Sequence, residues 1–124
     1  MNRADLLIVE DEALVAEMLR EALLDLGADT VHAVPSVRAA LDVLDHHTIT
    51  AAVLDLDLKG ETSAAVADAL VAARIPFAFF TGGTQSNLPV QHRSAIVVRK
   101  PAIEKLLDVV CEMCGGIGCP SSPS

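Results

Sequence analysis

The sequence contains no tryptophan and no tyrosine, and only three phenylalanines. Any core must therefore be built mainly from aliphatic side chains. Hydrophobic residues make up 52% of the chain and charged residues 21%, a balance that supports a packed core and disfavours intrinsic disorder. The length of 124 residues is suited to one compact domain.

Basic residues are scarce. Nine lysines and arginines stand against 17 aspartates and glutamates, so the formal net charge is −8. This balance disfavours nucleic-acid binding, because proteins neutralise phosphates with a basic face. A cationic partner surface or a bound metal ion suits the chain better.

Long apolar runs are also missing, since none approaches the roughly 18 residues that a membrane span requires. The N-terminal stretch "MNRADLLIVEDE" reaches acidic residues after a four-residue apolar run, which does not fit a signal peptide. We therefore expect a cytoplasmic protein that does not associate with a membrane.

Cysteines are few and odd in number, which does not make a disulfide framework. Cys111, Cys114 and Cys119 could form a zinc or redox site. However, Cys111 and Cys114 continue the apolar stripe of residues 103–110, and no fourth ligand is near. We interpret them as packing residues, because buried cysteines behave as small hydrophobes.

Short apolar runs alternate with helical stripes along the chain. The pattern predicts strands at residues 6–9, 30–34, 51–54, 76–80 and 95–98. It predicts helices at 12–26, from the N-cap Ser36 to about His46, at 63–73 and from 103 onward. Gly27 follows the first helix as its stop signal.

Continuous apolar strands that alternate with amphipathic helices indicate an α/β fold with a doubly wound, five-stranded parallel sheet. The flavodoxin-like strand order 2-1-3-4-5 fits five such strands. Residues 81–95 hold two glycines and a proline, so the fourth helix should be short or irregular. We expect the domain to cover residues 1–114 and a flexible tail to cover 115–124.

Polar side chains follow four of the predicted strands: Glu10, Asp11, Asp55, Thr81 and Lys100. In an open parallel sheet the site lies beyond the carboxyl ends of the strands, where strands one and three are neighbours. Three carboxylates there repel one another unless a cation lies between them, and Mg²⁺ prefers such oxygen ligands.

This set of groups suits phosphoryl transfer to a carboxylate. Asp55 is central and can act as the nucleophile, while a metal ion and Lys100 spread the charge of the transferred group. Each feature also has a plain structural explanation, such as acids favouring a helix N-terminus or a solvated loop. Their agreement at four strand ends favours the functional interpretation.

Four blocks carry a resemblance to a known family: "LLIVEDE" (6–12), "AAVLDLDLKGE" (51–61), "PFAFFTGG" (76–83) and "VVRKPA" (97–102). Over about residues 5–113 the chain resembles the receiver domain of two-component response regulators, in its stand-alone, single-domain form. The resemblance implies that a sensor histidine kinase or a histidine phosphotransfer protein donates the phosphoryl group.

The resemblance implies a role for each strand-end residue. Asp55 would be the phosphoacceptor, with Asp11 a direct Mg²⁺ ligand and Glu10 acting through water. Asp57 would offer its backbone carbonyl to the metal, and Thr81 would bond a phosphoryl oxygen.

Lys100 would pair with the phosphate, and the Lys100–Pro101 peptide bond would be cis. One departure concerns the readout: Val97 stands where the family often has an aromatic switch residue. The chain shows no output domain, so we expect output through an unknown downstream protein or as a phosphate sink, from a monomer or weak dimer.

Two other functions remain open. Asp55-x-Asp57 after an apolar strand is similar to the nucleophile motif of haloacid-dehalogenase-type phosphatases, but it would leave Glu10 and Asp11 unexplained. The chain could also be a pseudo-receiver, a binding module that is never phosphorylated; the intact acceptor, acid pair, threonine and lysine disfavour this.

Overall fold

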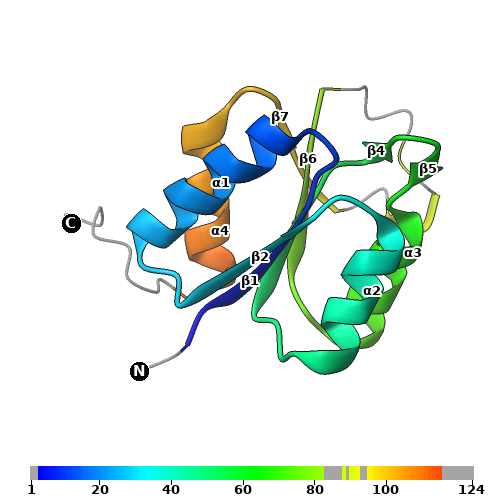
Figure 1. The fold of residues 1–124 in the computed structure, drawn as a ribbon, viewed down its shortest axis with the longest axis horizontal. Helices are drawn as coiled ribbons and strands as arrows, with labels where there is room; N and C mark the ends of the chain where they lie inside the picture. Colours follow the sequence, from blue (N-terminus) through cyan, green and yellow to red (C-terminus); the bar gives the residue numbers. More distant parts are fainter. Residues whose placement is uncertain (1–2, 83–87, 89, 93–94, 116–124) are drawn as a thin grey trace.

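The computed structural model of the protein describes residues 3–82, 88, 90–92 and 95–115 (Figure 1). Its centre is a five-stranded parallel sheet with the order β2-β1-β3-β6-β7, which confirms the predicted flavodoxin-like arrangement. The strands are β1 (Asp5–Val9), β2 (Thr30–Val34), β3 (Ala51–Leu54), β6 (Phe77–Thr81) and β7 (Ile96–Arg99).

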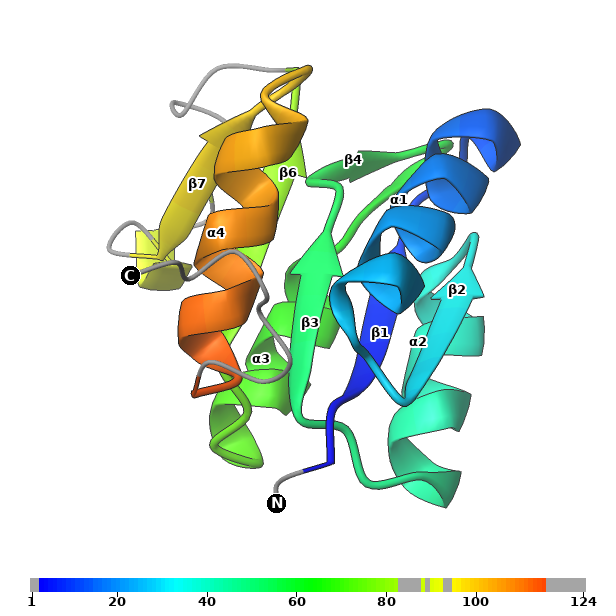
Figure 2. The ribbon, with the colours of Figure 1, turned by 90° about the vertical axis from the view of Figure 1, so that its left-hand side faces the viewer.

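Four α-helices formed by the described residues cover both faces of the sheet: α1 (Ala13–Leu26), α2 (Val37–His46), α3 (Ala64–Ala72) and α4 (Ile103–Met113). Helices α1 and α4 lie on one face, and α2 and α3 lie on the other (Figures 1 and 2). None of the helices in the described part of the chain is long and apolar enough to cross a bilayer.

The strands contribute side chains to two hydrophobic cores, one on each face of the sheet, because successive side chains of a strand point to opposite faces. In β1, Leu7 and Val9 are buried under α2 and α3, while Leu6 and Ile8 are buried under α1 and α4. Burial on both faces explains why the strand sequences are continuously apolar instead of alternating.

Ser36 and Gly27 mark helix ends in the structure, as predicted. The Ser36 side chain accepts a hydrogen bond from the Ala39 backbone N–H at 3.2 Å and caps α2. Gly27 ends α1 with φ 118°, a left-handed conformation that glycine adopts without a Cβ penalty.

The connection between β6 and β7 contains no α-helix among its described residues, which fits the predicted short or irregular helix. Its described element is η2, a 3-10 helix at Val90–His92. Leu88 and His92 are buried, and His92 Nε2 lies 2.7 Å from Asp68 Oδ1 on α3. The rest of the predicted segment, and residues 116–124 of the predicted tail, lie outside the described residues.

A small antiparallel hairpin, β4 (Asp57–Leu58) with β5 (Glu61–Thr62), was not predicted from the sequence. Two-residue strands are too short to show the alternation by which strands are recognised. Figure 2 shows β4 beyond the arrowhead of β3, at the carboxyl end of the sheet. The loop after Asp55 is therefore more ordered than predicted.

The cysteines divide into two kinds. Cys114 is buried in the core under α1 and α4, as predicted. Cys111 is disulfide-bonded, so it has a role beyond the packing that the apolar stripe favours. Cys119 lies outside the described residues. The apolar stripe identified the burial of Cys114 correctly, but a stripe carries no information about sulfur chemistry.

Candidate acidic site at the carboxyl ends of the strands

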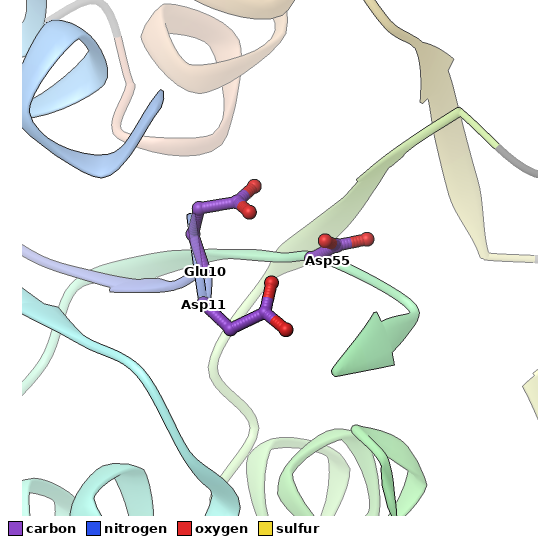
Figure 3. A group of neighbouring side chains, drawn as sticks. All are labelled: Glu10, Asp11 and Asp55. Carbon is purple, nitrogen blue, oxygen red and sulfur yellow. The ribbon is translucent and has the colours of Figure 1, made fainter. Parts of the chain in front are cut away.

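Three carboxylates from two neighbouring strands meet at one point. Glu10 and Asp11 directly follow β1 and Asp55 directly follows β3, and the register pairs Val9 with Leu54. One oxygen from each of the three side chains lies within 4.8 Å of the others. Figure 3 shows the three carboxylate groups turned toward a common space.

The backbone fixes the directions of two of these side chains. Glu10 Oε2 accepts a hydrogen bond from the Glu12 backbone N–H at 3.1 Å. Asp11 Oδ2 accepts one from the Lys59 backbone N–H at 2.8 Å, which comes from the turn between β4 and β5. Glu10 is 3% exposed and Asp55 7% exposed, so both are largely removed from water.

Lys100 supplies the positive charge of the site. Its Nζ lies 2.9 Å from Glu10 Oε1 and 3.3 Å from Asp55 Oδ2. The residue directly follows β7, and its backbone N–H donates to the carbonyl of Thr81 at 3.0 Å. The sheet therefore brings Lys100 to Asp55, which lies 45 positions earlier in the chain.

The close approach of these charged groups shifts the pKa values of Asp55 and Lys100. Burial, and then the charge of Glu10, raise the pKa of Asp55 to about 6, against smaller opposing effects of Lys100 and a backbone hydrogen bond from Asp57. Burial works to lower the pKa of Lys100. The hydrogen bond to Glu10 and the charges of Asp55 and Glu10 outweigh that effect, so its pKa is raised.

Thr81 and Asp57, the other two predicted site residues, differ in burial. Thr81 is buried at the carboxyl end of β6, and its strand lies between the strands that precede Asp55 and Lys100. The side chain of Asp57 is exposed and is not among the carboxylates that converge within the described residues. The Lys100–Pro101 peptide bond is cis, as predicted.

The donor set fits a hard divalent cation. All three converging groups offer carboxylate oxygens, and one lysine cannot neutralise three negative charges. Mg²⁺ prefers oxygen ligands, keeps several waters and binds through one or two carboxylates plus phosphate oxygens. The partly exposed Asp11 leaves room for such waters.

Sequence reasoning missed the contact from the Lys59 backbone to Asp11. The donor is a backbone N–H, which every residue except proline possesses, so the identity of Lys59 carries no signal. The available signal is Gly60, whose φ of 77° marks the tight turn that presents the Lys59 N–H.

No protein-family model and no curated protein matches the sequence. Among solved structures, SdrG from Sphingomonas melonis Fr1 is 37% identical, with a TM-score of 0.77, covering 91% of this chain and 98% of that chain. The BeF3-activated conformation of SdrG from Pseudomonas melonis Fr1 is 35% identical, with a TM-score of 0.75 and coverage of 92% and 99%. A response regulator receiver protein from Burkholderia phymatum shares the fold at 23% identity, a TM-score of 0.79 and coverage of 95% and 99%.

Proposed function

The chain belongs to the receiver-domain family of response regulators, and we propose that it accepts a phosphoryl group on Asp55. The donor would be the phosphohistidine of a sensor histidine kinase or of a histidine phosphotransfer protein. Mg²⁺ would be held by Glu10, Asp11 and Asp55, together with the backbone carbonyl of Asp57.

The observation that carries this proposal is the meeting of three carboxylates with one lysine at the carboxyl ends of adjacent strands. Their oxygens lie within 4.8 Å, and Lys100 reaches both Glu10 and Asp55. The three carboxylates favour a divalent cation, which would offset their negative charge. The cation and Lys100 together would then attract the negatively charged phosphoryl group.

In the transfer step, a carboxylate oxygen of Asp55 attacks phosphorus and forms an acyl phosphate. The phosphorus–nitrogen bond breaks, and its electron pair stays on the imidazole of the donor histidine. Hydrolysis by water later releases inorganic phosphate and restores the Asp55 carboxylate.

The other residues act on the charge of the transferred group. Bound Mg²⁺ would supply Lewis-acid stabilisation of the phosphoryl oxygens. Lys100 would exchange its contact with the Asp55 carboxylate for one with a phosphoryl oxygen. The Thr81 hydroxyl would donate a hydrogen bond to another. Asp11 and Glu10 would hold the metal and its water.

The similarity to SdrG supports this reading. A relative that is 35% identical over nearly the whole chain adopts a conformation described as BeF3-activated. Beryllofluoride on a carboxylate mimics an acyl phosphate. We propose that this chain passes its signal on by binding an unknown protein, or acts as a phosphate sink.

Labelling with a small phosphodonor, acetyl phosphate, tests the proposal. With Mg²⁺, intact mass spectrometry should show one added phosphoryl group that is stable in acid and labile in base. Asp55→Asn should abolish the label, because an amide is not a nucleophile of this kind. Asp57→Asn is the matched control and should keep the label, since its side chain is exposed.

Two results would contradict the proposal. Steady turnover of a phosphomonoester that is lost in Asp57→Asn would indicate a phosphatase that uses Asp57 as its acid. A folded wild-type protein that gains no phosphoryl group from any donor would indicate a pseudo-receiver.

A further inference from the structure

The hairpin of β4 and β5 forms contacts on both of its sides. Toward the site, the Lys59 backbone N–H donates to Asp11 Oδ2 at 2.8 Å. Away from it, Glu61 Oε2 accepts a hydrogen bond from the Val37 backbone N–H at 3.1 Å, at the first residue of α2. The hairpin thus connects one of the three converging carboxylates to a helix.

The hairpin needs such an anchor because it is small. Each strand has two residues, and an isolated two-stranded hairpin is marginally stable in water. Leu58 is buried in the core under α2 and α3 and anchors the first strand. Both residues of the second strand are exposed. Their side chains bond two different helices: Thr62 Oγ1 accepts from the Ala64 N–H of α3 at 3.4 Å, and Glu61 bonds α2. The Glu61 bond is the shorter of the two and the one that reaches across the sequence.

The N-terminus of α2 is well suited to bind the Glu61 carboxylate. Its first N–H groups have no intrahelical partner, and they attract a carboxylate through hydrogen bonding and the helix dipole. Two side chains accept hydrogen bonds from the N–H groups at the start of α2. The Ser36 hydroxyl accepts from the Ala39 N–H, and the Glu61 carboxylate accepts from the Val37 N–H, 24 positions away in the sequence. Ser36 serves the helix alone, whereas Glu61 also restrains the hairpin.

We propose that Glu61 is a positioning residue for the metal site: its bond to α2 fixes the hairpin whose Lys59 N–H orients the Asp11 carboxylate. This inference rests on the proposed function, in which Asp11 is a direct metal ligand. With Oδ2 bonded to Lys59, the second oxygen of Asp11 would be the one left to bind the ion. Loss of the anchor would leave Asp11 in several orientations and lower the affinity for Mg²⁺.

The test is an NMR titration of the full chain with MgCl₂, following backbone amide shifts around the site. Glu61→Ala should weaken Mg²⁺ binding about three- to tenfold, at or below the low end of what outer-shell changes cost, because Glu61 acts through the hairpin. Glu61→Gln loses the same charge but keeps an oxygen acceptor, so its affinity should return close to that of the wild type. Amide exchange at Lys59 should quicken in Glu61→Ala alone.

Ser36→Ala is the matched control, because it removes a cap from the same helix without touching the hairpin. It should lower stability and leave the Mg²⁺ affinity unchanged. The inference is overturned if Glu61→Ala binds Mg²⁺ like the wild type, if Glu61→Gln is as weak as Glu61→Ala, or if Ser36→Ala weakens binding equally. Absence of Mg²⁺ binding by the wild type would instead overturn the proposed function.

Discussion

Lys100 is the residue on which the charge balance of the site depends. It contacts Glu10 at 2.9 Å and Asp55 at 3.3 Å, and both carboxylates are largely buried. Without this ammonium group, the buried carboxylates of Glu10 and Asp55 would keep no ion pair with any residue that the structure describes. The same group that would bind a phosphoryl oxygen therefore also stabilises the metal-free fold.

Replacing this lysine should be costly in the absence of metal. Lys100→Met should lower the free energy of unfolding by about 1–3 kcal/mol, because removing one partner leaves buried charges uncompensated. Lys105→Met, at an exposed position on α4, is the control and should change little. Urea unfolding at pH 7 in EDTA checks this, and equal stability of the two variants would show that Lys100 does not stabilise the buried carboxylates.

The raised pKa of Asp55 gives the metal-free protein a characteristic dependence on pH. The folded pKa of about 6 exceeds the ordinary value of 3.8, so the folded state binds a proton more tightly than the unfolded chain. This stabilising contribution is complete below pH 3.8 and is lost as the pH rises through 6. Ionised Asp55 thus costs stability at pH 7–8.

Asp55→Asn should therefore be more stable than the wild type at pH 8 by about 1–2 kcal/mol, and the difference should shrink toward pH 5. Urea unfolding of both proteins across this range in EDTA measures the effect, because titrating groups that do not interact with Asp55 cancel in the difference. A difference that stays constant with pH would show that Asp55 has an ordinary pKa.

The site residues that directly follow a strand could be predicted from the sequence. Glu10, Asp11, Asp55 and Lys100 were all predicted to converge, because the carboxyl ends of parallel strands share an edge. What could not be predicted were the backbone donors and their anchors. The bond from Lys59 to Asp11 depends on the exact path of a turn, and a turn's path is set by packing around it.

Among the elements, α1 and α3 end in the same hydrogen-bonding pattern with different residues. After α1, the Gly27 and Ala28 N–H groups donate to Leu24 and Leu23. After α3, the Arg74 and Ile75 N–H groups donate to Val71 and Leu70. The residue at the turn must have positive φ, which Gly27 adopts at 118° and Arg74 at 61°.

Arg74 therefore carries a strain that glycine would remove. Arg74→Gly should raise the free energy of unfolding by about 0.5–1 kcal/mol, the left-handed penalty less the added freedom of the unfolded chain. Gly27→Ala, the reciprocal change, should destabilise the protein by a similar amount or more. Thermal unfolding of both variants checks the pair. Destabilisation by Arg74→Gly would mean that the arginine side chain makes compensating contacts.

The elements of the main sheet were predictable because each is a buried apolar run or an amphipathic stripe. Strand 30–34 and strand 51–54 have the predicted bounds, and the helices differ by a few residues at their ends. The hairpin of β4 and β5 was missed, and so was the bond by which Glu61 joins it to α2. Both depend on contacts between segments and leave no periodic pattern in the sequence.

At the scale of the whole molecule, the fold places negative charge where a bound cation would stabilise it. Mg²⁺ that binds only the folded state should stabilise the protein by RT ln(1 + [Mg²⁺]/Kd). Millimolar MgCl₂ should therefore raise the thermal midpoint of the wild type. The gain should be largely lost in Asp11→Ala, which removes a direct ligand.

Asp11→Ala should also unfold at a higher temperature than the wild type in EDTA, because one of three repelling carboxylates is gone. Differential scanning calorimetry with and without Mg²⁺ measures both effects. If the wild type and Asp11→Ala gain equally from Mg²⁺, the ion binds elsewhere and the assigned ligands are wrong.

If Asp55 becomes an acyl phosphate, chemical reduction can locate the modified residue in the sequence. Borohydride reduces an acyl phosphate to an alcohol, so the acceptor aspartate becomes homoserine and is identified by peptide mass spectrometry. After treatment with acetyl phosphate and Mg²⁺, we predict homoserine at position 55 and at no other aspartate. Homoserine at position 11 or 57, or at none, would show that Asp55 is not the phosphoacceptor.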